Sequence, residues 1–244
     1  MVADGANVTI SGCVNTGAVG AAENVTLQSA AGICGNAEDT AHIRLARCLN
    51  EGAITSAQGA AGICGFCEDT GASMPIVEVE LCANRGSISV QTSYAGGIAA
   101  RLCTSDSKVT SCYNTGKVQG TSYVAGIVGR IADSKVALSS CYNAGLVSAE
   151  KAPTVKKPSA GQIAGSYYSS AKKTYYGTLS SCVYDNTVGS LQGIGVLEYP
   201  NDGTAGVSTA DLKAVPAALA VCGQFRVNTS SLVNSGYPLL AWEL

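Results

Sequence analysis

Two cysteines three residues apart form the pair whose spacing could do chemistry, Cys64-Gly-Phe-Cys67. Thiolates at this spacing bind zinc or exchange disulfides when a metal or a nearby positive charge lowers the thiol pKa. The chain lacks a second such pair, has no thioredoxin-like βαβ pattern, and contains a single histidine, His42. Eleven cysteines is an odd number, so at least one thiol has no partner within the chain. We therefore expect most cysteines to be small core residues, a role that free cysteine fills well.

Acidic residues recur at one place in the chain. Glu38-Asp39 and Glu68-Asp69 each follow a similar short apolar segment, and Asp133 follows a third at the same offset. Stacked carboxylates repel unless they are solvated or bridged by a cation, and calcium takes oxygen ligands from such loops. Paired carboxylates could also serve sugar hydrolysis. We favour a solvated acidic edge, leave calcium at Asp39, Asp69 and Asp133 open, and expect no metal and no cofactor.

Two irregular segments, which we call the Tyr/Lys segments, interrupt the pattern: residues 149–159 are rich in lysine and proline, and residues 166–177 are rich in tyrosine. Loops that bulge from a regular scaffold are where binding usually occurs, and tyrosines can stack on sugar rings or anchor a protein partner. The alternative is that both segments are solvent-exposed loops without a binding role, with some of their tyrosines packed along the scaffold. The candidate binding residues are Lys156, Lys157, Tyr167, Tyr168, Tyr175 and Tyr176.

The elements that position these residues are set by a motif, Cys-x-Asn-x-Gly-x-Val, which occurs six times. Its copies begin at Cys13, Cys48, Cys82, Cys112, Cys141 and, in degenerate form, Cys182. A recurring period of 29 to 41 residues means that the chain is built by repetition. A small-residue-Gly-Ile segment follows each of the first five copies, with its isoleucine at Ile33, Ile63, Ile98, Ile127 and Ile163. Short runs of Val, Ile and Thr punctuated by Gly and Asn indicate strands.

A stacked coil explains this pattern. Residues two apart on a strand point the same way, so Cys, Asn, Gly and Val of the motif would share one face. That face is nearly constant and is expected to point inward, as ladders of Cys, Asn and Ile. The positions between vary, and we expect them to meet solvent: Val14, Leu49, Ala83, Tyr113 and Tyr142 occupy one of them. The sequence predicts an all-β parallel β-helix, expected to be right-handed, of about six turns over residues 1–190.

The period ends after Val188, and residues 191–244 are predicted to be a linker and a C-terminal cap. Ser208 is a suitable N-cap for a short helix, with Asp211 at its third position and Pro216 limiting its length. The open end of a solenoid exposes strand edges that must be covered. We expect Phe225, Tyr237 and Trp242 to close the core there.

Composition excludes some functions and suggests a context. The net charge is −2 and 13% of residues are charged, which gives no basic surface for nucleic acid or an anionic membrane. No run of about 18 apolar residues predicts a membrane span. Met1-Val-Ala-Asp4 is not a signal peptide, and we interpret the chain as a piece of a larger parent protein.

Together these segments resemble a known family. Cys112-Tyr-Asn-Thr-Gly-Lys-Val followed by Val124-Ala-Gly-Ile-Val-Gly129 resembles the GLUG-type repeat of bacterial surface and secreted proteins. The ending from Asp211 to Trp242 resembles the module that closes such arrays. The family occurs in multidomain exoproteins, including some proteases that cleave immunoglobulin A, where the repeats are not the catalytic part. The resemblance implies a spacer or adhesive module at the bacterial surface, with no catalytic residues to assign.

Three functions follow as hypotheses. The first is a non-catalytic structural or adhesive module of an extracellular bacterial protein, binding a glycan or a host surface protein through the Tyr/Lys segments. The second is an accessory domain of a secreted enzyme whose catalytic part lies elsewhere in the parent chain. The third, a polysaccharide lyase or hydrolase, rests on analogy with other β-helices alone. We expect no enzyme activity in this chain.

Overall fold

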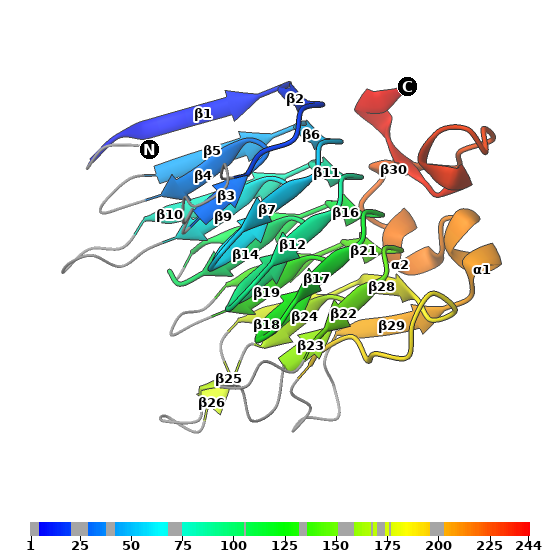
Figure 1. Ribbon diagram of the computed structural model, residues 1–244. Coiled ribbons are helices and arrows are strands. Elements are labelled where there is room, and N and C mark those ends of the chain that lie inside the picture. Colours follow the sequence, from blue (N-terminus) through cyan, green and yellow to red (C-terminus); the bar gives the residue numbers. More distant parts are fainter. Residues whose placement is uncertain are drawn as a thin grey trace.

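The computed structural model describes residues 5–20, 29–37, 42–67, 75–104, 106–131, 136–150, 159–166, 168–169, 174–175, 177–195 and 203–244. Short strands stack turn upon turn into a parallel β-helix, with the first turn at one end and the sixth at the other (Figure 1). The predicted all-β class and the number of turns are confirmed. Turns two to five each contribute one strand to each of five parallel sheets, which we number 1 to 5 along the turn.

The first two sheets run the full length of the stack. Sheet 1 contains β1 (Asn7–Ser11), β5 (His42–Ala46), β10 (Ile76–Glu80), β15 (Lys108–Thr110), β20 (Ala137–Ser139) and β27 (Thr178–Ser180). Sheet 2 contains β2 (Val14–Asn15), β6 (Leu49–Asn50), β11 (Ala83–Asn84), β16 (Tyr113–Asn114), β21 (Tyr142–Asn143), β28 (Cys182–Asp185) and β29 (Thr204–Val207).

The other three sheets complete each turn. Sheet 3 contains β7 (Ile54–Ser56), β12 (Ile88–Val90), β17 (Val118–Gly120) and β22 (Val147–Ala149). Sheet 4 contains β3 (Ser29–Ala31), β8 (Gly59–Ala61), β13 (Tyr94–Gly96), β18 (Tyr123–Ala125) and β23 (Ser159–Gly161). Sheet 5 contains β4 (Cys34–Ala37), β9 (Cys64–Cys67), β14 (Ala99–Leu102), β19 (Val128–Ile131) and β24 (Ala164–Ser166).

The motif cysteine sits just after a tight corner between sheets 1 and 2. The residue before it adopts a left-handed conformation in all six copies, with φ between 52° and 66°: Gly12, Arg47, Leu81, Ser111, Ser140 and Ser181. The thiol donates back across that corner to the carbonyl two residues earlier, as Cys112 Sγ does to Thr110 O at 3.3 Å. Cysteine suits the position because it is small, apolar and able to donate this weak hydrogen bond.

The motif asparagine forms the predicted ladder at the next corner. Asn50 Nδ2 donates to Gly52 O, which fixes the local bend, and to Asn84 Oδ1 of the next turn at 2.7 Å. The same pair of bonds recurs at Asn84 and Asn114. Asn50, Asn84 and Asn114 are fully buried, so the ladder satisfies amides that would otherwise be costly to desolvate.

Two apolar cores fill the stack, separated by this ladder. The larger holds the cysteine ladder, the isoleucine ladder and the inner residues of sheets 1 and 5, such as Leu45 and Val128. The smaller lies between sheets 3 and 4 and contains Ile54, Ile88 and Val124. Each turn buries its side chains only with its neighbours, which is the general logic of solenoids.

The C-terminal segment, residues 203–244, differs from the predicted cap in its position. After β29 it forms α1 (Thr209–Lys213), α2 (Ala217–Ala220), the antiparallel pair β30 (Phe225–Arg226) and β31 (Leu239–Leu240), and two short 3₁₀ helices, η1 (Asn234–Gly236) and η2 (Ala241–Glu243). β29 extends sheet 2 beyond the sixth turn, and Ser208 caps α1 as predicted. The rest of the segment then runs back along the outer side of sheet 2 (Figure 1).

Its aromatic residues therefore cover a side wall and do not close the end of the stack. Phe225 packs edge-on against Tyr142, at 5.4 Å between ring centroids. Trp242 Nε1 donates to Leu81 O in the third turn at 2.8 Å. Tyr113 and Tyr142, which we expected to meet solvent, are fully buried beneath the segment and stack on each other. Within the described residues no helix has the length and apolar character to cross a bilayer.

Candidate functional site

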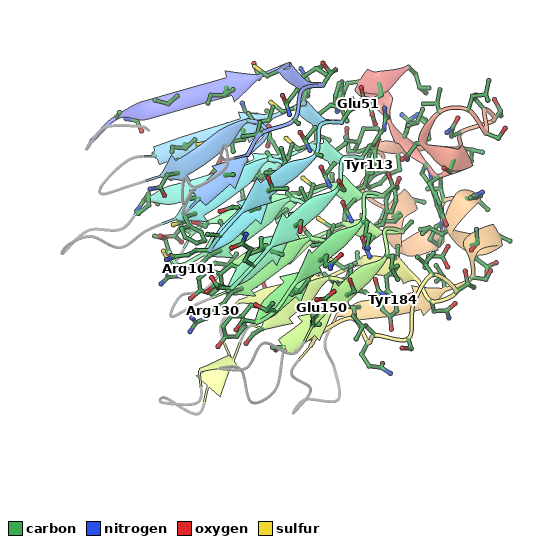
Figure 2. The ribbon with its side chains drawn as sticks, viewed as in Figure 1. Glu51, Arg101, Tyr113, Arg130, Glu150 and Tyr184 are labelled. Carbon is green, nitrogen blue, oxygen red and sulfur yellow. The ribbon has the colours of Figure 1, made fainter. Side chains whose placement is uncertain are left out.

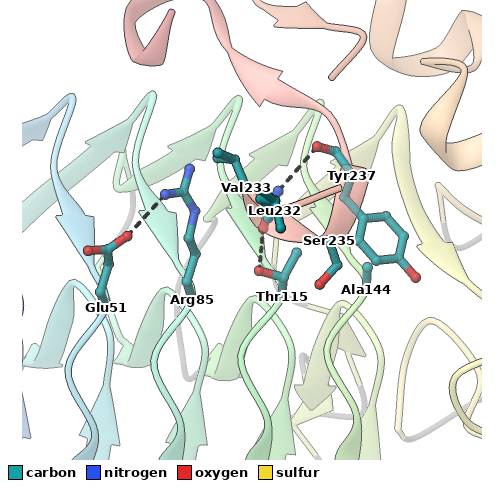
Figure 3. A pocket seen from close by; sticks show the side chains of 9 residues that line it. Glu51, Arg85, Thr115, Ala144, Leu232, Val233, Ser235 and Tyr237 are labelled. Carbon is teal, nitrogen blue, oxygen red and sulfur yellow. Dashed lines mark hydrogen bonds and ion pairs between the residues drawn. The ribbon is translucent and has the colours of Figure 1, made fainter. Parts of the chain in front are cut away.

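An open groove of about 550 Å³ lies where the C-terminal segment meets the outer edge of sheet 2. Figure 3 shows its floor, where Glu51, Arg85 and Thr115 extend from three successive turns toward the segment. These residues occupy one variable position of the repeat. Thr115 Oγ1 donates to Asn234 Oδ1 at 2.6 Å, which ties the groove's two sides together. The lining residues are Glu51, Arg85, Thr115, Ala144, Leu232, Val233, Asn234, Ser235 and Tyr237.

The charged side chains at the centre of this groove make hydrogen bonds and ion pairs within the protein. Arg85 donates to Glu51 Oε1 at 3.1 Å and to the Tyr113 hydroxyl at 2.8 Å, and it also pairs with Glu243. Burial raises the pKa of Glu243, although the Arg85 guanidinium acts in the opposite direction. Burial would lower the pKa of Arg85, but Tyr113 and Glu243 outweigh it and raise the pKa. We conclude that Arg85 fastens the end of the chain to the third turn.

Asp185, at the end of β28 in the sixth turn, also ties the C-terminal segment to the β-helix. Its two carboxylate oxygens accept hydrogen bonds from the Thr187 N–H and hydroxyl, the Thr209 hydroxyl and, at 2.7 Å, the Tyr237 hydroxyl. Burial alone would raise the pKa of Asp185, but these donors outweigh it and lower the pKa. Burial, with the Asp185 carboxylate beside it, raises the pKa of Tyr237 to about 12. Asp185 is therefore held as a carboxylate and Tyr237 as a neutral phenol, and the hydrogen bond between them is structural.

The Cys64–Cys67 pair does not form a shared site. Cys64 lies in register with Cys34 in the turn before it, as the predicted stacking requires. Cys67 instead places its sulfur 3.1 Å from Cys103 Sγ in the next turn, and all these thiols are buried. In the described part of the chain no group of three or more His, Cys, Asp and Glu side chains could hold a metal ion. The contact between Cys67 and Cys103 is packing within the larger apolar core.

A different surface brings aromatic and basic side chains together on the outside of sheets 4 and 5. We call Phe66, Tyr94, Arg101, Tyr123 and Arg130 the arginine–tyrosine wall. Tyr94 and Tyr123 stack at 5.5 Å between ring centroids, and Phe66 meets Tyr94 edge-on at 5.4 Å. Arg130 lies over Tyr123 at 4.7 Å, and Arg101 lies over Tyr94 at 5.8 Å. Figure 2 shows Arg101 and Arg130 at the side of the stack away from the C-terminal segment.

Strand register explains how the wall arises. Tyr94 pairs with Tyr123 in sheet 4, while Phe66, Arg101 and Arg130 are successive partners in sheet 5. The next position in the tyrosine column is Gly59, where only glycine fits because the Phe66 ring fills the space that a Cβ would need. The two columns face each other across the bend that holds the Gly-Ile pair. Tyr94, Arg101, Tyr123 and Arg130 are all partly exposed.

The predicted binding residues lie next in the stack, but most fall outside the described residues. Ser159 follows Tyr123 in its column, and Ser166 follows Arg130. The end of the first Tyr/Lys segment, at Ser159, and the start of the second, at Ser166, therefore lie beside the wall. The backbones of Tyr168 and Tyr175 pair in a small antiparallel hairpin, β25 (Tyr168–Ser169) with β26 (Thr174–Tyr175). The other predicted residues, Lys156, Lys157, Tyr167 and Tyr176, lie outside the described residues, as do the acidic positions Asp39, Asp69 and Asp133.

The wall was missed in the sequence, although a signal for it was present. Tyr94 precedes Ile98 by four residues, and Arg101 follows it by three; Tyr123 and Arg130 have the same offsets from Ile127. Aligning the repeats on the isoleucine would have placed both pairs in adjacent columns. The contact across the bend, however, depends on how sharply the Gly-Ile segment turns, which spacing alone does not specify.

Comparison with known proteins bears on the fold. No family model matches the chain, and no curated protein matches it. The fold is similar to the crystal structure of a putative immunoglobulin A1 protease from Bacteroides ovatus, with a TM-score of 0.57 and 16% sequence identity. The match covers 98% of this chain and 87% of the other. At this identity the likeness establishes a shared β-helical architecture and nothing further.

Proposed function

We propose that this chain is a non-catalytic binding module of an extracellular bacterial protein, built from GLUG-type repeats, that attaches to a glycan or a host surface protein. The arginine–tyrosine wall carries the proposal. It offers stacked phenol rings and two guanidinium groups on a sheet surface, in register with Ser159 and Ser166, the residues at which the first Tyr/Lys segment ends and the second begins. Aromatic and arginine side chains are the residues that most often anchor binding interfaces.

The polar residues elsewhere support a binding role over catalysis. Arg85, Glu243 and Asp185 are buried or half-buried charged groups with several partners, and each fastens the C-terminal segment to the β-helix. The motif cysteines pack in the core, and the motif asparagines hydrogen-bond to one another in the internal ladder. A lyase or hydrolase would need acid and base groups that converge on one accessible wall.

A second function, an accessory domain of a secreted enzyme, is favoured by one observation. The structure that shares this fold over 98% of the chain is that of a putative immunoglobulin A1 protease. In that case the wall would hold the substrate or the cell surface while a catalytic domain elsewhere in the parent chain acts.

The test is binding of the purified chain to an array of glycans and extracellular host proteins. We expect binding to one class, and loss of that binding in a Tyr94→Ala/Tyr123→Ala variant whose circular dichroism is unchanged. A second variant, with residues 151–158 and 167–176 each shortened to a Gly-Ser linker, tests the Tyr/Lys segments separately. No binding on any array would reject the binding module. Hydrolysis or elimination of an arrayed glycan by the wild-type chain would make it an enzyme.

A further inference from the structure

The two arginines of the wall form a like-charged pair in adjacent turns. Arg101 and Arg130 are direct partners in the parallel register of sheet 5, where strands lie about 4.8 Å apart. Two guanidinium groups so close repel each other unless an anion or a polarisable surface compensates them. The tyrosine rings supply part of that compensation, because Arg130 lies over both Tyr94 and Tyr123.

Several positive charges elsewhere on the described part of the β-helix are compensated by carboxylates. On the outer face of sheet 1, Glu78 accepts a hydrogen bond from Lys108 at 2.9 Å and lies 3.7 Å from His42, and Arg44 pairs with Glu80. Arg85 pairs with two glutamates. Arg101 and Arg130, by contrast, make no ion pair with any carboxylate in the described residues. Within the part of the chain that the structure describes, no carboxylate compensates the positive charge of these two side chains.

The surroundings of the two arginines hold them in place for such a ligand. The Arg130 Nη1 donates to the Tyr94 hydroxyl at 3.1 Å, which fixes its plane against the rings. Arg101 has a buried Nε–H with no hydrogen-bond partner among the described residues, while the residue as a whole is partly exposed, so an external anion would meet its Nη groups. A guanidinium that stacks by its face can still donate its remaining N–H groups to the oxygens of a carboxylate or sulfate.

We propose that Arg101 and Arg130 bind the acidic group of an anionic glycan, a carboxylate or a sulfate, while Tyr94 and Tyr123 contact the adjoining sugar. This inference rests on the binding function proposed above and specifies its ligand class. The phenol rings provide flat apolar surface and hydroxyls at one site, which is the combination that a sugar ring presents in return. The repeat of Tyr and Arg in successive turns fits a polymer that carries acidic groups at regular intervals.

The test compares two double variants that remove the same charge. Arg101→Gln/Arg130→Gln changes the wall, and Arg44→Gln/Lys108→Gln removes two positive charges from the exposed face of sheet 1. The probes are polygalacturonate for carboxylates, heparin for sulfates and dextran as the uncharged control, measured by isothermal titration calorimetry at two salt concentrations. We expect the wall variant to lose about tenfold or more in affinity for an anionic probe, the range for charge-assisted hydrogen bonds. The sheet 1 variant should change less than about twofold, since it affects only long-range attraction.

Several outcomes would overturn the inference. Equal losses in the two double variants would mean non-specific attraction to positive charge. Wild-type binding that is as tight to dextran, or to a host protein, and survives in the wall variant would leave a binding module with a different ligand. An Arg130→Lys variant that keeps the charge but not the two-point geometry should show an intermediate loss, which guards against misfolding of the double variant.

Discussion

The side-chain amide of Asn143 donates its ladder hydrogen bond to Gln162 Oε1, at 2.6 Å, and not to a residue at the asparagine position of the next turn. That position is Tyr184, the register partner of Asn143. In earlier turns the residue at the place of Gln162 is glycine, as at Gly126, because the next asparagine fills the space of its Cβ: a Cβ there would lie 2.1 Å from Asn143 Cγ. Gln162, from the Gly-Ile bend on the other side of the turn, thus supplies the amide oxygen that Tyr184 lacks.

This exchange predicts a coupled pair of substitutions. Gln162→Gly should destabilise the protein by about 1–3 kcal/mol, because it leaves the buried Asn143 amide short of an acceptor. Tyr184→Asn in the same chain should recover part of that loss by restoring the asparagine ladder. Urea denaturation of the two single variants and the double variant measures the coupling. Additive losses would show that Asn143 does not depend on Gln162.

The opposite substitution at an earlier turn is the matched control. Gly126→Gln should destabilise severely, since its side chain would compete with Asn143 for one space. A folded Gly126→Gln variant of wild-type stability would contradict the steric explanation.

Asp185 predicts a specific loss of stability in acid. Its pKa is lowered in the folded protein, so its contribution is complete above the unfolded value near 4 and disappears as the pH falls through the folded value. Asp185→Asn should therefore cost about 1–3 kcal/mol at pH 7, and the gap to wild type should narrow below about pH 4. Urea denaturation of both proteins between pH 7 and pH 3 checks this. A gap that is independent of pH would show that the carboxylate charge is not involved.

Tyr142 predicts how firmly the C-terminal segment is held. Its hydroxyl donates to Pro238 O at 2.5 Å and accepts from Asn234 Nδ2 at 3.1 Å. Tyr142→Phe should cost about 1–2 kcal/mol, because both partners lose a bond beneath the segment. Tyr123→Phe, on the partly exposed wall, should change stability by less than about 0.5 kcal/mol. Thermal denaturation compares the two, and equal effects would contradict the role given to the Tyr142 hydroxyl.

The ion pair between Arg85 and Glu243 is also expected to stabilise the end of the C-terminal segment. Arg85→Met leaves Glu243 buried without its cation and should cost about 3 kcal/mol. Faster amide hydrogen exchange in residues 234–244 should accompany it. Arg44→Met, which breaks an exposed ion pair on sheet 1, should cost under about 1 kcal/mol. Unchanged exchange in 234–244 would mean that the segment is held by apolar packing alone.

The cysteine ladder predicts selective thiol reactivity. Of the eleven cysteines, Cys13 is exposed and Cys222 is partly exposed, while the others are buried in the core. The reduced native protein should therefore react rapidly at these two thiols, and at the remainder only after denaturation. Titration with a thiol reagent, with and without guanidinium, gives the count, and peptide mapping identifies the sites. Rapid labelling of one of the buried motif cysteines, such as Cys112, would place the ladder outside the core.

The sequence by itself determined the repeat, the inward face and the ladders. Parallel strands stack identical positions at one short spacing, so residues that recur at a fixed place, such as Cys34 and Cys64 or Asn50 and Asn84, must lie in register. Local rules also located the Ser208 cap. These features need only the residue spacing within a turn and the contact between one turn and the next.

Tertiary structure decided which outer surfaces are covered. Variability at Tyr113 and Tyr142 suggested solvent, but a segment about 100 residues later in the chain buries both. The charge on Arg85 is tolerated because Glu243 at the end of the chain meets it. Likewise, only the bend between sheets 4 and 5 brings the Tyr94 and Arg101 columns into contact. Contacts between distant segments depend on where the chain returns, and no periodic pattern encodes that path.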